Sequence, residues 1–175
     1  MGNFALLILR TTLGLLMAGH GSQKLFGWFN GPGMEGTGGF MESLGLKPGS
    51  RWAALAAGSE FGGGVLTLLG LLNSLGPLGV VGSMAMAARK VHWKTPVFAT
   101  EGGPELPLIN IAIASVLMMS GDGKYSMDHA LGIRLPRWIA PIGFMIALLM
   151  VANTVTEEED QQEESGGEPG EPESL

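Results

Sequence analysis

One apolar stretch, Arg51 to Leu72, constrains the fold more than any other part of the chain. It is long and apolar enough to cross a bilayer, yet it carries a carboxylate, Glu60, near its middle. At about 100° per residue, its small and polar residues gather on one side, and these are Ala53, Ala56, Ala57, Glu60, Gly64 and Thr67. Its leucines gather on the other side, at Leu55, Leu66, Leu69 and Leu72. We therefore expect the small face to pack inward, the leucines to face lipid, and Glu60 to need a partner within a bundle.

Four further apolar segments are expected at about residues 4–26, 77–92, 106–120 and 138–155. Hydrophobic residues make up 46% of the 175 residues and charged residues 15%, which is less charge than soluble domains usually carry. The sequence therefore predicts an all-α integral membrane protein with a four-helix transmembrane bundle. The fifth segment is barely long enough to span, and we expect it to add one C-terminal helix.

The charge of the chain is unevenly distributed. The last twenty residues hold nine of the sixteen acidic residues and no Lys or Arg, so residues 1–155 carry seven acidic against ten basic residues, a net charge of +3. We expect three regions: a membrane domain over 1–133, an additional apolar helix over 134–155 and a disordered acidic tail over 156–175. If every apolar segment crosses, the positive-inside rule puts the N-terminus outside and the tail in the cytoplasm.

Several functional classes are excluded or disfavoured because the sequence lacks the residues that they need. There is no cysteine, which excludes disulfides, thiol catalysis and cysteine-bound iron–sulfur clusters. There is no nucleotide-binding fingerprint and no convincing metal-ligand set, and no nucleic-acid partner is expected. Any catalytic role would therefore need a partner or a bound cofactor.

Segment 4–26 carries the polar residues that are the main candidates for a site. Arg10, His20 and Lys24 share one side of this helix within roughly 120°. Arg10 is the favoured partner for Glu60, with Lys24 and Arg89 as alternatives. Glu60 is either a structural ion-pair residue or a proton-handling or ligand-binding carboxylate, and Lys24 either lines a pocket or extends to the interface.

Secondary polar candidates lie at the ends of the later segments, at Arg89, His92, Glu105 and Asp128. Glu105 is expected to cap its helix and to pair with Lys90 or Lys94, and Asp128 to cap the segment after Ser126. His20 and His92 are weighed as haem ligands against simple hydrogen-bonding residues, and no metal site is predicted because two histidines without further ligands are a thin pattern.

Four stretches in order resemble the DoxX family, also described as DoxD/DoxX or terminal quinol oxidase small-subunit-like. The first is Arg10-x-x-x-Gly14 followed by Gly19-His-Gly-Ser-Gln-Lys24, and the second is Gly58-Ser-Glu60-Phe-Gly-Gly63. The third is His92 followed by Glu101-Gly-Gly-Pro-Glu105-Leu-Pro-Leu108, and the fourth is Gly121-Asp-Gly-Lys-Tyr-Ser-Met-Asp128. Together they cover roughly residues 4–133.

The resemblance implies a multi-pass cell-membrane protein with a four-helix bundle. It implies an accessory subunit of a quinone-linked redox system, with a bound quinone, the lipid bilayer and other redox subunits as partners. On this interpretation Arg10, His20, Lys24 and Glu60 form one polar pocket. The alternatives are a small-solute or proton transporter using the same polar stripe, and a membrane scaffold for soluble enzymes.

Overall fold

The computed structural model describes residues 2–121, 123–136 and 138–166, with side chains up to Asn153, and all regular secondary structure in these residues is helical. The α-helices are α1 (Asn3–Phe26), α2 (Gly33–Ser43), α3 (Gly49–Leu69), α4 (Leu75–Lys90), α5 (Glu105–Ser120), α6 (Met127–Leu131) and α7 (Ile139–Gly166). Two short 3₁₀ helices, η1 (Trp28–Asn30) and η2 (Ala99–Glu101), lie in the connections. The predicted all-helical class is confirmed.

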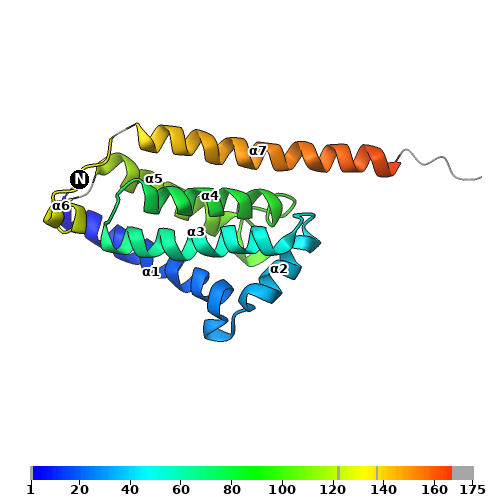
Figure 1. Cartoon of the computed structure of the whole chain (residues 1–175), viewed down its shortest axis with the longest axis horizontal. Helices are drawn as coiled ribbons and strands as arrows, with labels where there is room; N and C mark the ends of the chain where they lie inside the picture. The colour runs from blue at the N-terminus through cyan, green and yellow to red at the C-terminus, as the bar shows by residue number, and fades with distance from the viewer. Residues whose placement is uncertain (1, 122, 137, 167–175) are drawn as a thin grey trace, which may run out of the picture.

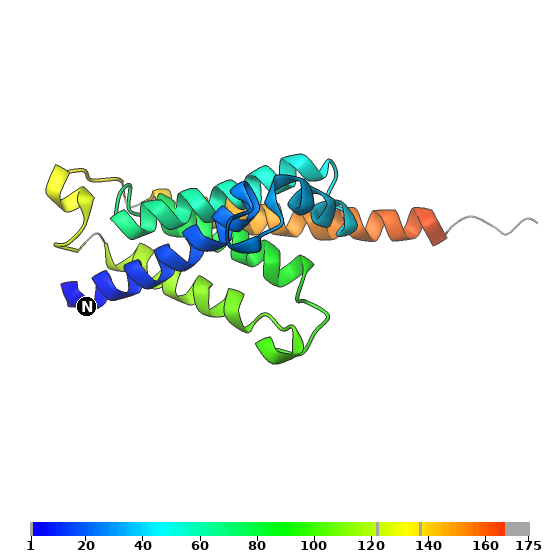
Figure 2. The same cartoon turned by 90° about the horizontal axis from the view of Figure 1, so that it is seen from below.

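The long helices run side by side, in the spatial order α1, α3, α4 and α7 across the view of Figure 1. α5 packs on α4 and on part of α1. Figure 2 shows α1 and α5 close together at the end that bears the N-terminus and separating toward the other end. α2 packs against α1 and α3 at that other end.

Glycines allow α1 and α3 to approach closely. A Cβ placed on Gly64 would lie 2.4 Å from the backbone nitrogen of Ala18, and one placed on Gly21 would lie 2.3 Å from that of Phe61. Gly14 faces Leu68 in the same way. These contacts fix the register of the two helices, and they confirm that the small face of α3 packs inward.

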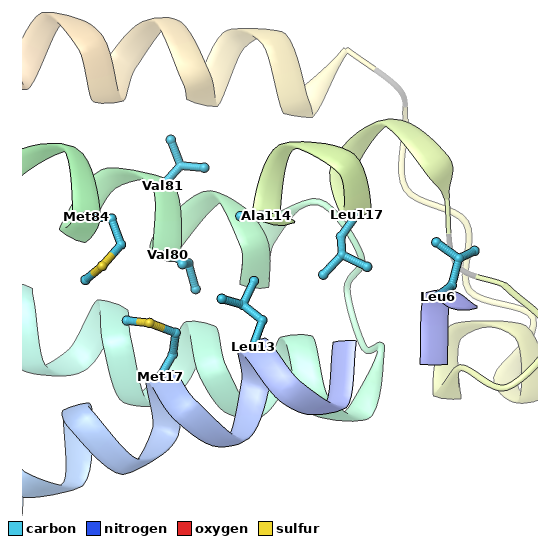
Figure 3. Packing of buried hydrophobic residues seen from close by; sticks show 8 residues of the cluster. All are labelled: Leu6, Leu13, Met17, Val80, Val81, Met84, Ala114 and Leu117. Carbon is cyan, nitrogen blue, oxygen red and sulfur yellow. The ribbon is translucent and has the colours of Figure 1, made fainter. Parts of the chain in front are cut away.

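The main hydrophobic core lies between α1, α4 and α5. Figure 3 shows its eight buried residues, Leu6, Leu13, Met17, Val80, Val81, Met84, Ala114 and Leu117. Leu13, Met17, Val80 and Ala114 are at most 1% exposed. This core joins α1, α4 and α5.

Two helices of the described chain are long and apolar enough to cross a membrane, α1 and α3. α4 and α5 have sixteen residues each, or about 24 Å of helix, which is less than the roughly 30 Å hydrocarbon core. A four-span bundle therefore stays a prediction.

The expected segment boundaries need three corrections. The helix containing Glu60 ends at Leu69 rather than Leu72, because Gly70 adopts a left-handed conformation (φ 61°) that ends it. The second correction concerns the helix expected at 77–92, since α4 begins at Leu75 and ends at Lys90.

The third correction concerns the tail. α7 continues to Gly166, so residues 156–166 are helical rather than disordered. Glu and Gln have high helix propensity, and adding residues to an existing helix avoids the cost of nucleating a new one. The remainder of the predicted disordered tail, 167–175, lies outside the described residues.

Candidate functional site: an apolar cavity with a buried ion pair

A cavity of about 440 Å³ lies along α4, between α3 on one side and α7 on the other. α2 closes it at one end with Phe40, Met41 and Leu44, and Lys24 of α1 reaches into it. The lining is mostly apolar, with polar side chains at Lys24, Ser59, Glu60, Ser83 and Lys90. This volume lies within the range of small-molecule sites, about 300–1,000 Å³, and apolar walls with a few polar groups are also typical of such sites.

Glu60 and Lys24 form an ion pair in the wall of this cavity. The Nζ of Lys24 donates a hydrogen bond to Oε1 of Glu60. Glu60 is 2% exposed, whereas the Lys24 side chain is 29% exposed. The second carboxylate oxygen, Oε2, is buried and has no hydrogen-bond partner among the described residues. One acceptor atom of a buried carboxylate in the cavity wall is therefore left unsatisfied by the described part of the chain.

The pairing follows from the register of α1 against α3. Gly14 lies against Leu68, Ala18 against Gly64 and Gly21 against Phe61, so the last turn of α1 lies beside the middle of α3. Lys24 is on that last turn. Its side chain therefore needs to reach only a short way to Glu60.

Arg10 is not the partner of Glu60, contrary to the expectation from the sequence. It lies fourteen residues before Lys24 on the same helix, which is about 21 Å along the axis. Its guanidinium is buried, with 8% of the residue exposed, and its Nη2 donates a 2.5 Å hydrogen bond to the carbonyl of Tyr125. Arg10 therefore holds the segment after α5 against the opposite end of the bundle.

Asp128 acts in the same region. Its carboxylate accepts hydrogen bonds from the backbone nitrogens of Leu72 (2.9 Å) and Asn73 (2.8 Å), and its own nitrogen donates to the carbonyl of Gly70. Ser126, not Asp128, caps the short helix α6 by accepting from the nitrogen of His129. Asp128 thus ties α6 to the turn between α3 and α4. The sequence had instead suggested that it caps its own helix.

The remaining candidates do not join the cavity site. His20 is exposed on α1, and Nδ1 of His92 contacts the carbonyl of Gly102 at 2.5 Å. The Arg89 guanidinium lies 5.5 Å from the centre of the Trp93 ring. Glu105, the first residue of α5, accepts a 2.8 Å hydrogen bond from the backbone nitrogen of Ala99. It therefore stabilises η2, which precedes α5. Within the described residues, no group of three or more His, Asp or Glu residues could hold a metal ion.

Sequence reasoning missed the residues that α4 and α7 contribute to the cavity. Two signals were present: glycines at Gly79 and Gly82 of α4, and the pair Gly143-x-x-x-Ala147 of α7. Small residues spaced in this way allow two helices to approach closely. The spacing of Gly143 and Ala147, and not the length of segment 138–155, indicates the face of α7 that packs on α4.

Comparison with known proteins gives one match. The family model of DoxX matches residues 5–93, which include all of α1 except its first two residues, α2 to α4, and the Lys24–Glu60 pair. No curated protein and no solved structure matches the chain. Because the matched residues make up just over half of the 175, the chain belongs to the DoxX family of membrane proteins.

Proposed function

We propose that this chain is a quinone-binding accessory subunit of a membrane redox system, anchored in the cell membrane by several spans. The observation that carries the proposal is the Lys24–Glu60 pair in the wall of a 440 Å³ apolar cavity. A quinone combines a flat ring bearing two carbonyl oxygens with an apolar chain. The cavity offers polar groups for the first and apolar walls for the second.

The residues supply complementary hydrogen bonds for the two redox states of such a ligand. Lys24 carries N–H donors, which suit a quinone carbonyl, and its side chain is partly accessible. The Glu60 carboxylate lines the cavity and has an acceptor oxygen without a partner in the described part of the chain, so it suits the hydroxyl of a quinol. A bound quinone would supply the electron-transfer chemistry, and the protein would hold and orient it. We expect Glu60 to contribute more to quinol binding and Lys24 more to quinone binding.

Binding of a short-chain quinone and quinol to the purified full-length protein tests the proposal. Trp52 lines the cavity, so quenching of its fluorescence reports occupancy, and Trp52→Phe identifies its share of the signal. Glu60→Gln should weaken quinol binding about tenfold or more, as expected for one lost hydrogen bond to a charged group. Glu35→Gln, at an exposed acid of α2, is the matched control and should bind as wild type.

The alternatives give different results in the same preparation. A transporter would conduct a solute or protons in liposomes that contain this protein alone, and it would bind no quinone. A scaffold would retain its soluble partners in Glu60→Gln. Wild-type protein that binds neither quinone nor quinol would overturn the proposal.

A further inference from the structure

α7 is positioned on α4 by small residues. A Cβ on Gly143 would lie 2.1 Å from Cδ2 of Leu78, so any larger residue there would have to displace the Leu78 side chain. One turn further along, Ala147 lies against Gly82, where a Cβ would come 3.9 Å from that of Ala147. The residues of α7 that line the cavity are spaced as one helical face, at Gly143, Ile146, Ala147, Met150 and Val151. The large apolar side chains of this stretch are exposed on both faces, with Ile146 and Met150 of the lining face exposed as well as Phe144, Met145, Leu148 and Leu149.

Gly79 and Gly82 form part of the floor that α4 gives the cavity, beside the side chains of Leu78, Ser83 and Met86. Gly79 lies against Ser59 of α3, the residue before Glu60, and Gly82 lies against Ala147 of α7. Gly79 and Gly82 are one turn apart on one face, and both line the cavity. α3, which carries Glu60, and α7, which carries Ala147, therefore lie on either side of the same short stretch of α4.

We infer that α7 completes the ligand site, as the wall against which a flat ring packs when its polar atoms contact Lys24 and Glu60. The small residues at 82 and 147 leave room for a planar ring between α3 and α7, and a bulkier residue at either position would fill part of that room. This wall lies outside residues 5–93, so the family-matched part of the chain forms only part of the site. The inference rests on the proposed function, because the ring is that of the quinone.

Two alanines of α7 provide a matched test. Ala147 faces Gly82 and the cavity, whereas Ala152 is exposed on the same helix. Ala147→Leu in the full-length protein should weaken binding of the short-chain quinone at least tenfold by Trp52 quenching. Ala152→Leu should stay within twofold of wild type. Equal affinities of Ala147→Leu and wild type would overturn the inference.

Gly82→Ala is a second test of the site, in case Ala147→Leu loses affinity only because the protein unfolds. A methyl group at position 82 meets no atom nearer than 3.9 Å, so we expect wild-type thermal stability. It raises the floor of the site, so we expect at least a fivefold loss of affinity. Unchanged affinity in this variant would also overturn the inference.

The outcomes separate the two proposals. Suppose that wild type binds quinone, that Glu60→Gln weakens quinol binding, and that Ala147→Leu and Gly82→Ala bind as wild type. The proposed function then stands, and the inferred role of α7 is wrong. If wild type binds no quinone, both fail.

Discussion

Glu60 places a charge inside the bundle, and Lys24 is the residue that balances it. Lys24→Met would leave a carboxylate that is 2% exposed without its cation. Breaking a buried pair from one side typically costs about 3–5 kcal/mol. Because Lys24 is partly exposed, we expect a loss of about 3 kcal/mol in the free energy of unfolding, at the lower end of that range, measured in detergent.

The same substitution at Lys47, which is exposed, is the control for Lys24→Met and should have little effect. The double variant Lys24→Met/Glu60→Gln should recover part of the loss, because it removes the unbalanced charge. Additive losses in the double variant would show that the two residues do not interact.

Among the residues that the structure describes, Asp128 is the second buried carboxylate, and its role is structural. It is 1% exposed and accepts two backbone hydrogen bonds from the turn after α3. Asp128→Asn replaces one acceptor oxygen with a donor that would face a backbone N–H. We expect a loss of about 2 kcal/mol in the free energy of unfolding, because hydrogen bonds to charged groups contribute about 1.5–3 kcal/mol each.

Glu101→Gln, at an exposed acid, is the comparison for Asp128→Asn and should leave the unfolding midpoint unchanged. Quinone affinity should also be unchanged in Asp128→Asn, since Asp128 does not line the cavity. If Asp128→Asn is as stable as wild type, Asp128 does not stabilise the contact between α6 and the turn after α3.

At the scale of elements, the contact between α1 and α3 depends on individual glycines. Gly64→Ala would put a methyl group 2.4 Å from the backbone of Ala18, so the helices must separate. Overpacking of this kind usually costs about 1–3 kcal/mol. We expect a loss in that range, measured by thermal unfolding in detergent.

Gly58→Ala is the matched control on the same helix. Nothing lies within 4 Å of a Cβ there, so the change should be neutral or stabilise by about 0.5–1 kcal/mol through helix propensity. Equal effects at the two positions would mean that α1 and α3 are not in close contact. Gly64→Ala should also weaken quinol binding, because it shifts Lys24 relative to Glu60.

At the scale of the whole molecule, the two ends of the bundle should lie on opposite sides of the membrane. Figure 1 places the N-terminus and α6 at one end and α2 at the other. Lys124 lies in the connection before α6, and Lys47 in the connection after α2. The positive-inside rule predicts that the Lys47 end is cytoplasmic.

The absence of native cysteine makes this topology directly measurable. Single cysteines at Lys124→Cys and Lys47→Cys should differ in intact cells: a membrane-impermeant maleimide should label the first and not the second. After lysis both should react. Labelling of both residues in intact cells, or of Lys47→Cys alone, would contradict the predicted arrangement.

Much of the helical layout could be predicted from sequence alone. Segments 4–26 and 106–120 match α1 and α5 within one residue, because long apolar runs bounded by glycine or proline have few alternatives. The inward face of α3 was also predictable, since its small residues and its leucines fall on opposite sides of the helix. These features depend on neighbours within one helix.

The partner of Glu60 could not be predicted in this way. Arg10 and Lys24 share a side of α1, so periodicity cannot choose between them. The register against α3 makes that choice, and it depends on backbone contacts at Gly14, Gly21 and Gly64. Such contacts join residues far apart in the sequence.

The sequence by itself determined that this chain is helical, that its apolar segments are long, and that Glu60 lies on an inward face. Only the tertiary structure decided that Lys24 pairs with Glu60, that Arg10 binds the Tyr125 carbonyl instead, and that α7 lies along α4 and lines the cavity. The physical reason is that hydrophobic periodicity acts within a helix, whereas an ion pair and a cavity wall depend on how close packing aligns one helix with another.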